Sequence, residues 1–211
     1  MRGVDLDDVG REQADRVASR LAPLPLAAIV TSPLERTVQT ARAIATAQTT
    51  PVTVRRDKGL LECGYGSWTG QPLKELAKHP LWKVVQTQPS AVTFPDGESM
   101  INMQHRAVTA VRTIDAEVAG THGDDACWVA VSHGDVIKSV LADALGMHLD
   151  AFQRLTVHPG SVSVLRYSAA RPTVLYINDG GADLSGLKPP AKKRRRKRTG
   201  DATVGGGDGT L

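Results

Sequence analysis

Aromatic residues are scarce in this sequence, since Phe, Trp and Tyr together make up 4% of its 211 residues. The hydrophobic content is nevertheless 41%, so the core must consist mostly of Ala, Val, Leu and Ile. The length suits a single domain, because domains commonly contain about 100–200 residues. These proportions are typical of a soluble globular domain and exclude a fibrous or low-complexity chain.

Long apolar runs and cysteine pairs are absent as well. No segment approaches the ~20 apolar residues that a membrane-spanning helix needs. The first residues, MRGVDLDDVGREQ, lack the apolar stretch of a secretory signal. The two cysteines, Cys63 and Cys127, form no C-x-x-C pair. We therefore expect two reduced, partly buried thiols in a cytoplasmic protein.

The excess of basic charge is confined to one end of the chain. Residues 188–211 contain eight basic and two acidic residues, whereas the remainder contains 18 basic and 20 acidic residues. With so few apolar side chains, this segment is expected to be a disordered tail behind a folded domain at residues 1–187. Its run Lys192–Arg198 is suited to contact nucleic acid or another acidic surface, although a solvated extension without a partner is the simpler interpretation.

Helices and short strands alternate along the folded part. Apolar spacing and capping residues predict helices over residues 8–21 and 98–118, one opening at Ser32 and one following residue 133. Short apolar or β-branched runs predict strands and a final hairpin at residues 27–31, 52–55, 128–132, 161–167 and 173–178. This alternation predicts an α/β fold of three layers, α/β/α, with a mainly parallel central sheet. The apolar run WVAVS at 128–132 predicts a strand covered on both faces.

Ser32 and Arg36 follow the predicted strand at residues 27–31. Ligands of open α/β sheets gather at the carboxyl ends of strands, which makes this turn a candidate site. Ser32 is suited to cap the next helix, with Pro33 in its first turn and Glu35 completing a capping box. Arg36 could hold two phosphate oxygens through its planar fork. A surface arginine on an amphipathic helix has the same spacing, so this alternative stays open.

His133 and Glu62 are the other candidates for chemistry. His133 stands at a strand-to-helix turn, where the N–H groups of the helix favour an anion, and it could stabilise charge on a phosphoryl oxygen. The alternative is a hydrogen-bonded histidine with a purely structural role. Glu62 could act as a general acid or base if burial raises its pKa. Otherwise it is a solvated loop carboxylate.

The remaining histidines do not indicate a metal site. They match neither an H-E-x-x-H motif nor a cysteine–histidine ligand cluster. We therefore expect no metal and no other cofactor. These residues are His79, His105, His122, His148 and His158.

Taken together, four segments resemble the histidine phosphatase superfamily, the phosphoglycerate mutase-like phosphatases. They are SPLERTVQTA, LLECGYGSWTG, FPDGES and VSHGDVIKSVLADALG, in the order and spacing of that family. The leading segment, VDLDDVGREQADRVASRL, is similar to the family's first helix. The resemblance extends from about Val4 to Asn178.

The resemblance implies a metal-independent phosphatase that forms a phosphohistidine. It implies that Arg36 and His133 hold the phosphoryl oxygens and that Glu62 protonates the leaving oxygen and then assists water. Residues expected to line the substrate side are Ser32, Glu98, Ser99 and Gly134. The expected partner is a small phosphorylated substrate. Hydrolysis of a phosphomonoester by a phosphatase is favoured over the reaction of a mutase. A homodimer is compatible with the resemblance.

One part of the family pattern has no match. The family's first strand, with its arginine-histidine-glycine motif and the attacking histidine, would precede Val4. We therefore expect a domain whose first strand is missing from this sequence, with unpaired backbone groups and an apolar slot in the sheet. A phosphatase completed by a preceding strand is the favoured interpretation. The alternatives are a mutase-type phosphoryl transferase and a phosphoester-binding protein without turnover.

Overall fold

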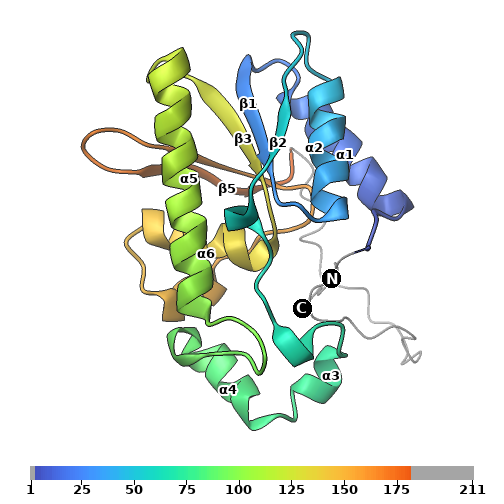
Figure 1. Ribbon diagram of the computed structural model, residues 1–211, viewed down its shortest axis with the longest axis vertical. Coiled ribbons are helices and arrows are strands. Elements are labelled where there is room, and N and C mark those ends of the chain that lie inside the picture. Colours follow the sequence, from blue (N-terminus) through green and yellow to red (C-terminus); the bar gives the residue numbers. More distant parts are fainter. Residues whose placement is uncertain (1–2, 182–211) are drawn as a thin grey trace.

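The computed structural model describes residues 3–181, which contain eleven α-helices and strands and four short 3-10 helices (Figure 1). The α-helices and strands are α1 (Asp8–Leu21), β1 (Leu26–Thr31), α2 (Glu35–Thr46), β2 (Val54–Arg56), α3 (Leu73–Leu76), α4 (Pro80–Thr87), α5 (Met100–His122), β3 (Cys127–Val131), α6 (Gly134–Ala144), β4 (Val162–Arg166) and β5 (Thr173–Asp179).

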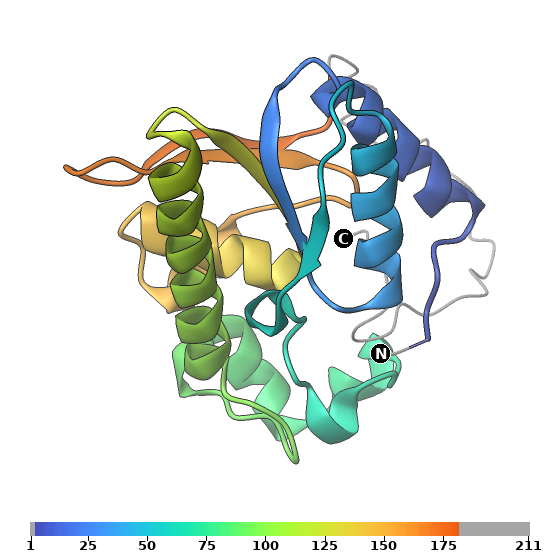
Figure 2. The same cartoon turned by 45° about the horizontal axis from the view of Figure 1, so that its top comes forward.

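A parallel sheet in the order β2-β1-β3 forms the middle layer. Successive side chains of β1 point to opposite faces, as strand geometry requires. Ile29 packs with α1 and α2, whereas Val30 packs in the larger cluster that includes α5 and α6. Figures 1 and 2 show the corresponding helix pairs on the two sides of the sheet. The predicted α/β fold with a parallel central sheet is confirmed.

Strand β3 is less covered than the sequence predicted. It occupies one edge of the parallel sheet, and Cys127 and Ala130 are exposed. The expectation of a strand covered on both faces was therefore wrong. Of the two cysteines expected to be partly buried, Cys127 is exposed and Cys63 is buried. An apolar run therefore does not distinguish an edge strand such as β3 from a strand in the interior of a sheet.

The final hairpin is confirmed but does not extend the parallel sheet. Strands β4 and β5 pair antiparallel with each other and form a separate two-stranded sheet. Val162 packs against the buried cluster formed mainly by side chains of α1, β1 and α2. On β5, three consecutive large side chains are exposed, namely Leu175, Tyr176 and Ile177.

Two predicted helix starts differ from the structure. Helix α2 begins at Glu35, and its N-cap, Leu34, makes no side-chain capping bond. Ser32 is thus not the N-cap but lies before the helix, where its carbonyl and that of Leu34 accept from the Thr37 hydroxyl. Helix α5 begins at Met100, capped by the Ser99 hydroxyl, which accepts from the Asn102 amide.

The irregular excursion predicted between residues 62 and 97 is confirmed, with α3 and α4 as its short helices. Figures 1 and 2 show it beyond the carboxyl ends of the strands. Trp68 is buried and makes edge-to-face contacts with Phe94 and His79, while Tyr65 packs edge-on against Phe94. These aromatic residues belong to the same buried cluster as Val30 of β1 and Met103 of α5, so they anchor the loop that carries Glu62 to the main core.

Some expectations fall outside the described residues. The basic tail, Lys192–Arg198 included, and the domain boundary at residue 187 lie beyond residue 181. Within residues 3–181, no helix combines the length and apolar character needed to cross a membrane.

Candidate functional site

The structure brings Ser32, Arg36, Glu62 and His133 together at the carboxyl ends of β1 and β3. The Nη2 atom of Arg36 lies 3.0 Å from Nδ1 of His133. The Nε2 atom of His133 lies 2.8 Å from the hydroxyl of Ser32. An Oε2 atom of Glu62 lies 4.0 Å from Nδ1 of His133. Three segments far apart in the sequence therefore meet at one imidazole ring.

Strand pairing explains this meeting. Thr31 is in register with Val131, and the Ser32 amide donates to the Val131 carbonyl at 2.9 Å. Because the two strands are parallel, the residues that follow them emerge at the same edge of the sheet. Gly134 then begins α6, and His133 occupies the N-cap position without a side-chain capping bond. The first N–H groups of α6 thus lie beside the histidine, where they favour an anion.

The neighbours of His133 define its tautomer. Arginine can only donate, so Nδ1 accepts from Arg36 and the proton resides on Nε2, which donates to the Ser32 hydroxyl. Burial, followed by the Arg36 charge, lowers the pKa of His133 to about 3. The imidazole is therefore neutral at physiological pH, with one N–H that can be offered to an anion.

Glu62 has the opposite shift. Burial raises its pKa to about 7, and the nearby carboxylate of Asp135 adds to the effect, while a hydrogen bond from the Cys63 amide and the Arg36 charge oppose it. Asp135 is held by the Tyr65 hydroxyl at 2.8 Å and by Lys138 at 3.0 Å. Glu62 therefore exchanges a proton near neutral pH, as a general acid or base must.

The other predicted substrate-side residues make local contacts. The Glu98 carboxylate accepts from the Gly64 amide at 2.7 Å and from Arg106, and the Ser99 hydroxyl caps α5. Gly134 leaves open space where a Cβ would stand. Direct contact of Glu98, Ser99 or Gly134 with a substrate stays a prediction.

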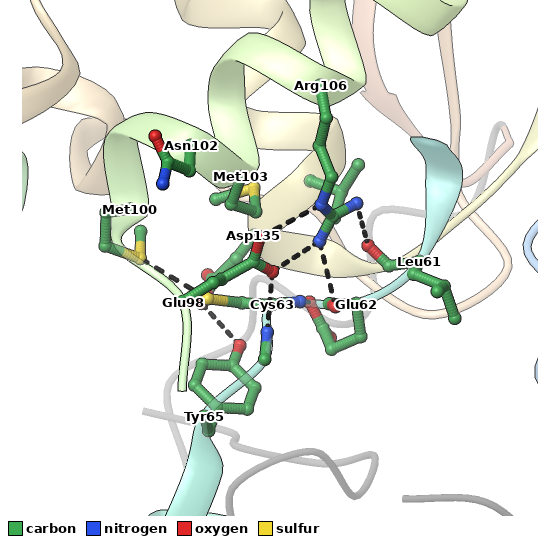
Figure 3. Close-up of polar contacts among 12 residues, drawn as sticks. Leu61, Glu62, Cys63, Tyr65, Glu98, Met100, Asn102, Met103, Arg106 and Asp135 are labelled. Carbon is green, nitrogen blue, oxygen red and sulfur yellow. Dashed lines mark hydrogen bonds and ion pairs between the residues drawn. The ribbon is translucent and has the colours of Figure 1, made fainter. Parts of the chain in front are cut away.

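Sequence reasoning missed three residues around Glu62, shown in Figure 3. Tyr65 lies in the segment LLECGYGSWTG and Asp135 in VSHGDVIKSVLADALG, so their closeness in sequence to Glu62 and His133 could have indicated them. Arg106 lies eight residues beyond Glu98 on α5 and belongs to no motif. Its contact with the Glu62 loop depends on folding and had no signal in the sequence. As for metals, residues 3–181 contain no group of three or more His, Cys, Asp or Glu side chains placed to bind one.

Known proteins resemble this chain in sequence and in fold. Phosphoserine phosphatase 1 of Hydrogenobacter thermophilus is 30% identical over 176 residues, which cover 82% of this chain and 80% of that protein. Glucosyl-3-phosphoglycerate phosphatase of Mycolicibacterium vanbaalenii is 32% identical over 149 residues, covering 69% of this chain and 65% of its own length. The solved structure of Bacillus stearothermophilus YhfR superimposes with a TM-score of 0.74 at 26% identity, covering 85% of this chain and 88% of that one.

The family model of the histidine phosphatase superfamily (branch 1) matches residues 1–180, which include every residue of the site. The chain therefore belongs to the histidine phosphatase superfamily.

Proposed function

We propose that this chain carries the phosphate pocket of a phosphatase that hydrolyses small phosphomonoesters through a phosphohistidine. The convergence of Arg36, Glu62 and His133 on one point is the observation that carries the proposal. Two relatives at 30% identity or more are phosphatases of small phosphorylated molecules, by their names a phosphoserine and a glucosyl-3-phosphoglycerate phosphatase. Their names support hydrolysis.

In this mechanism the pocket binds the phosphoryl group by charge and by hydrogen bonds. Arg36 holds two equatorial oxygens, and the Nε2–H of His133 donates to a third, helped by the N-terminus of α6. As the attacking nitrogen bonds to phosphorus, the bond to the leaving oxygen breaks and Glu62 gives that oxygen its proton. Glu62, now a carboxylate, takes a proton from the water that attacks the phosphohistidine, and inorganic phosphate leaves.

The attacking histidine requires a separate proposal. The five histidines other than His133 are all exposed, at positions 79, 105, 122, 148 and 158. We propose that the nucleophile stands on a strand that pairs with the open edge of β3, in a segment preceding Val4. The separation of the β4–β5 sheet from β3 and the exposed apolar side chains of β5 support such a place. A strand parallel to β3 would end beside His133.

Two other functions use the same pocket. A mutase-type phosphoryl transferase would need the pocket to hold a second phosphorylated molecule. A phosphoester-binding protein without turnover would use Arg36 and His133 alone.

A homodimer stays a prediction, and so does a contact of Lys192–Arg198 with nucleic acid. The contacts within residues 3–181 test neither of them.

The first test compares this chain with a version extended by a strand bearing an arginine-histidine-glycine motif. The extended protein should hydrolyse p-nitrophenyl phosphate, form an acid-labile phosphoprotein and be inhibited by orthovanadate. The chain as it stands should bind orthovanadate, measured by calorimetry, without hydrolysing the ester. Arg36→Ala should weaken that binding about 10- to 100-fold, because a charge-assisted hydrogen bond contributes roughly 1.5–3 kcal/mol.

Arg112→Ala, at the solvent-exposed pair with Asp143, is the matched control for loss of an arginine. Equal orthovanadate binding by Arg36→Ala, His133→Ala and the parent would contradict the proposed pocket. An extended protein that binds orthovanadate but hydrolyses nothing would favour the binding protein over the phosphatase.

A second prediction concerns Asp135. Asp135→Asn removes the negative charge that raises the pKa of Glu62, so that pKa should fall from about 7, by on the order of one pH unit. The titration can be followed by carboxyl carbon NMR, with Glu62 assigned from a Glu62→Gln spectrum. Asp143→Asn, whose carboxylate pairs with Arg112 at the surface, is the control. An unchanged Glu62 titration in Asp135→Asn would show that burial alone sets its pKa.

A third prediction concerns stability. The folded-state pKa of Glu62 lies above its ordinary value, so the folded protein binds more protons than the unfolded chain between about pH 4.5 and 7. Its free energy of unfolding should fall as the pH rises through that window. Glu62→Gln removes this loss. The free energy of unfolding of the variant, relative to that of the parent, should therefore rise by about 2 kcal/mol from pH 5 to pH 8, measured by urea unfolding. Glu117→Gln at the surface is the control, and a gain independent of pH would contradict the assignment.

A further inference from the structure

Arg106, on α5, uses every N–H of its guanidinium group. Nε donates to Oε2 of Glu98 at 3.0 Å, and Nη2 donates to Oε1 of the same carboxylate at 2.6 Å. Nη1 donates to the carbonyls of Gly59 and Leu61 at 2.9 and 2.7 Å. The second N–H of Nη2 donates to the carbonyl of Glu62 at 3.1 Å. These five bonds match the five donors of an arginine side chain.

All these acceptors lie in two segments, and one of them carries Glu62 (Figure 3). Arg106 binds the segment before and at Glu62 directly. Glu98 binds the segment just after it, because its Oε1 accepts from the Gly64 amide at 2.7 Å and its own amide donates to the Gly64 carbonyl at 2.8 Å. The backbone on both sides of Glu62 is therefore tied to one ion pair.

The ion pair is shielded from water, which makes its geometry matter. The side chains of Arg106 and Glu98 are 26% and 23% exposed, and their contact is bidentate. Lysine has three donors on one atom and cannot reproduce such a fork. Removing either partner leaves a partly buried charge or several partly buried carbonyls without this partner, at a cost above that of a surface pair.

The two segments also touch through their backbones. A Cβ at Gly97 would lie 2.1 Å from the Gly64 carbonyl oxygen, and one at Gly66 would lie 2.0 Å from the Pro95 carbonyl oxygen. Only glycine permits so close an approach, and Gly66 has a φ of +54° besides. The two segments thus pack closely through their backbones, and Arg106 and Glu98 add side-chain hydrogen bonds across the same contact.

We propose that Arg106, together with Glu98, positions Glu62. The ion pair holds the loop so that the Glu62 carboxyl faces His133 and Arg36 instead of solvent. The proposal rests on the proposed function, in which Glu62 is the general acid. None of the Arg106 hydrogen bonds reaches the side chain of Arg36, Glu62 or His133, so it is a positioning residue and not a catalytic one. Glu98 would accordingly act through the loop, whether or not it also contacts substrate.

The surroundings of the Glu62 carboxyl explain how its position can be measured. Asp135 from α6, Arg36 from α2, His133 at the end of β3 and Tyr65 from its own loop all face it, and burial is the largest influence on its protonation. If the loop is released, the carboxyl gains water and moves away from Asp135, and both changes lower the pKa of Glu62. Because burial is the largest influence, they outweigh the loss of the Cys63 amide bond and of the Arg36 charge, which oppose it.

The test is a titration of Glu62 in the whole chain by carboxyl carbon NMR, with Glu62→Gln for assignment. In Arg106→Ala the titration midpoint should fall by one pH unit or more, and in Glu98→Gln it should fall by less, since the amide oxygen can still accept from Gly64. Arg112→Ala, which removes an arginine from the same helix at the surface, should leave the midpoint unchanged. Each spectrum is recorded well below the melting temperature of its variant.

The melting temperature separates positioning from a general structural role. A purely structural Arg106 would lower the melting temperature of Arg106→Ala and leave the Glu62 midpoint where it is in the parent, and that result would overturn the proposal. If Arg106→Ala does not fold, Arg106→Lys keeps the charge with fewer donors, and the same comparison decides. The outcome is independent of turnover, because orthovanadate binding and ester hydrolysis test the proposed function, whereas the titration tests only where Glu62 is held.

Discussion

The parallel pairing of β1 with β3 is the constraint on which the site depends. It places Thr31 beside Val131, so that Ser32 and His133 emerge together and α2 and α6 begin at the same edge. Arg36 reaches His133 from the first turn of α2, and the loop after β2 brings Glu62 to the same ring. The chemistry of the pocket is therefore a consequence of sheet topology, since no two of these three residues are near each other in sequence.

Burial then sets the charges of the pocket. It favours the neutral form of both His133 and Glu62, whose pKa values move in opposite directions toward about 3 and about 7. Arg36 keeps its positive charge, although burial lowers its pKa somewhat. A site with the Arg36 cation, a neutral N–H donor and an exchangeable proton suits a phosphoryl dianion, which is negatively charged. The same burial that costs stability thus prepares the site for its ligand.

Much of this could be predicted from the sequence, and the failures have physical causes. Helix α1 was predicted with its observed bounds from its apolar spacing and from the prolines that follow it, and the structure adds the Asp7 cap at its start. The candidate residues could be found because strand ends and helix starts are local features. The exposure of β3, the missing cap at Ser32 and the role of Arg106 depend on contacts between distant segments. Ser32 illustrates the point. Local propensity favours a helix cap at this serine, but its hydroxyl binds His133, a partner 101 positions away.

The central claim is that Arg36 and His133 form a single phosphate-binding pocket, and a crystal structure with bound orthovanadate tests it most directly. The account predicts vanadate at the carboxyl ends of β1 and β3, with oxygens within hydrogen-bond distance of the Arg36 guanidinium and of Nε2 of His133. Arg36 would then share its donors between the anion and the imidazole. Vanadate bound elsewhere, with the Arg36–His133 contact unchanged from 3.0 Å and no oxygen near either side chain, would contradict the account.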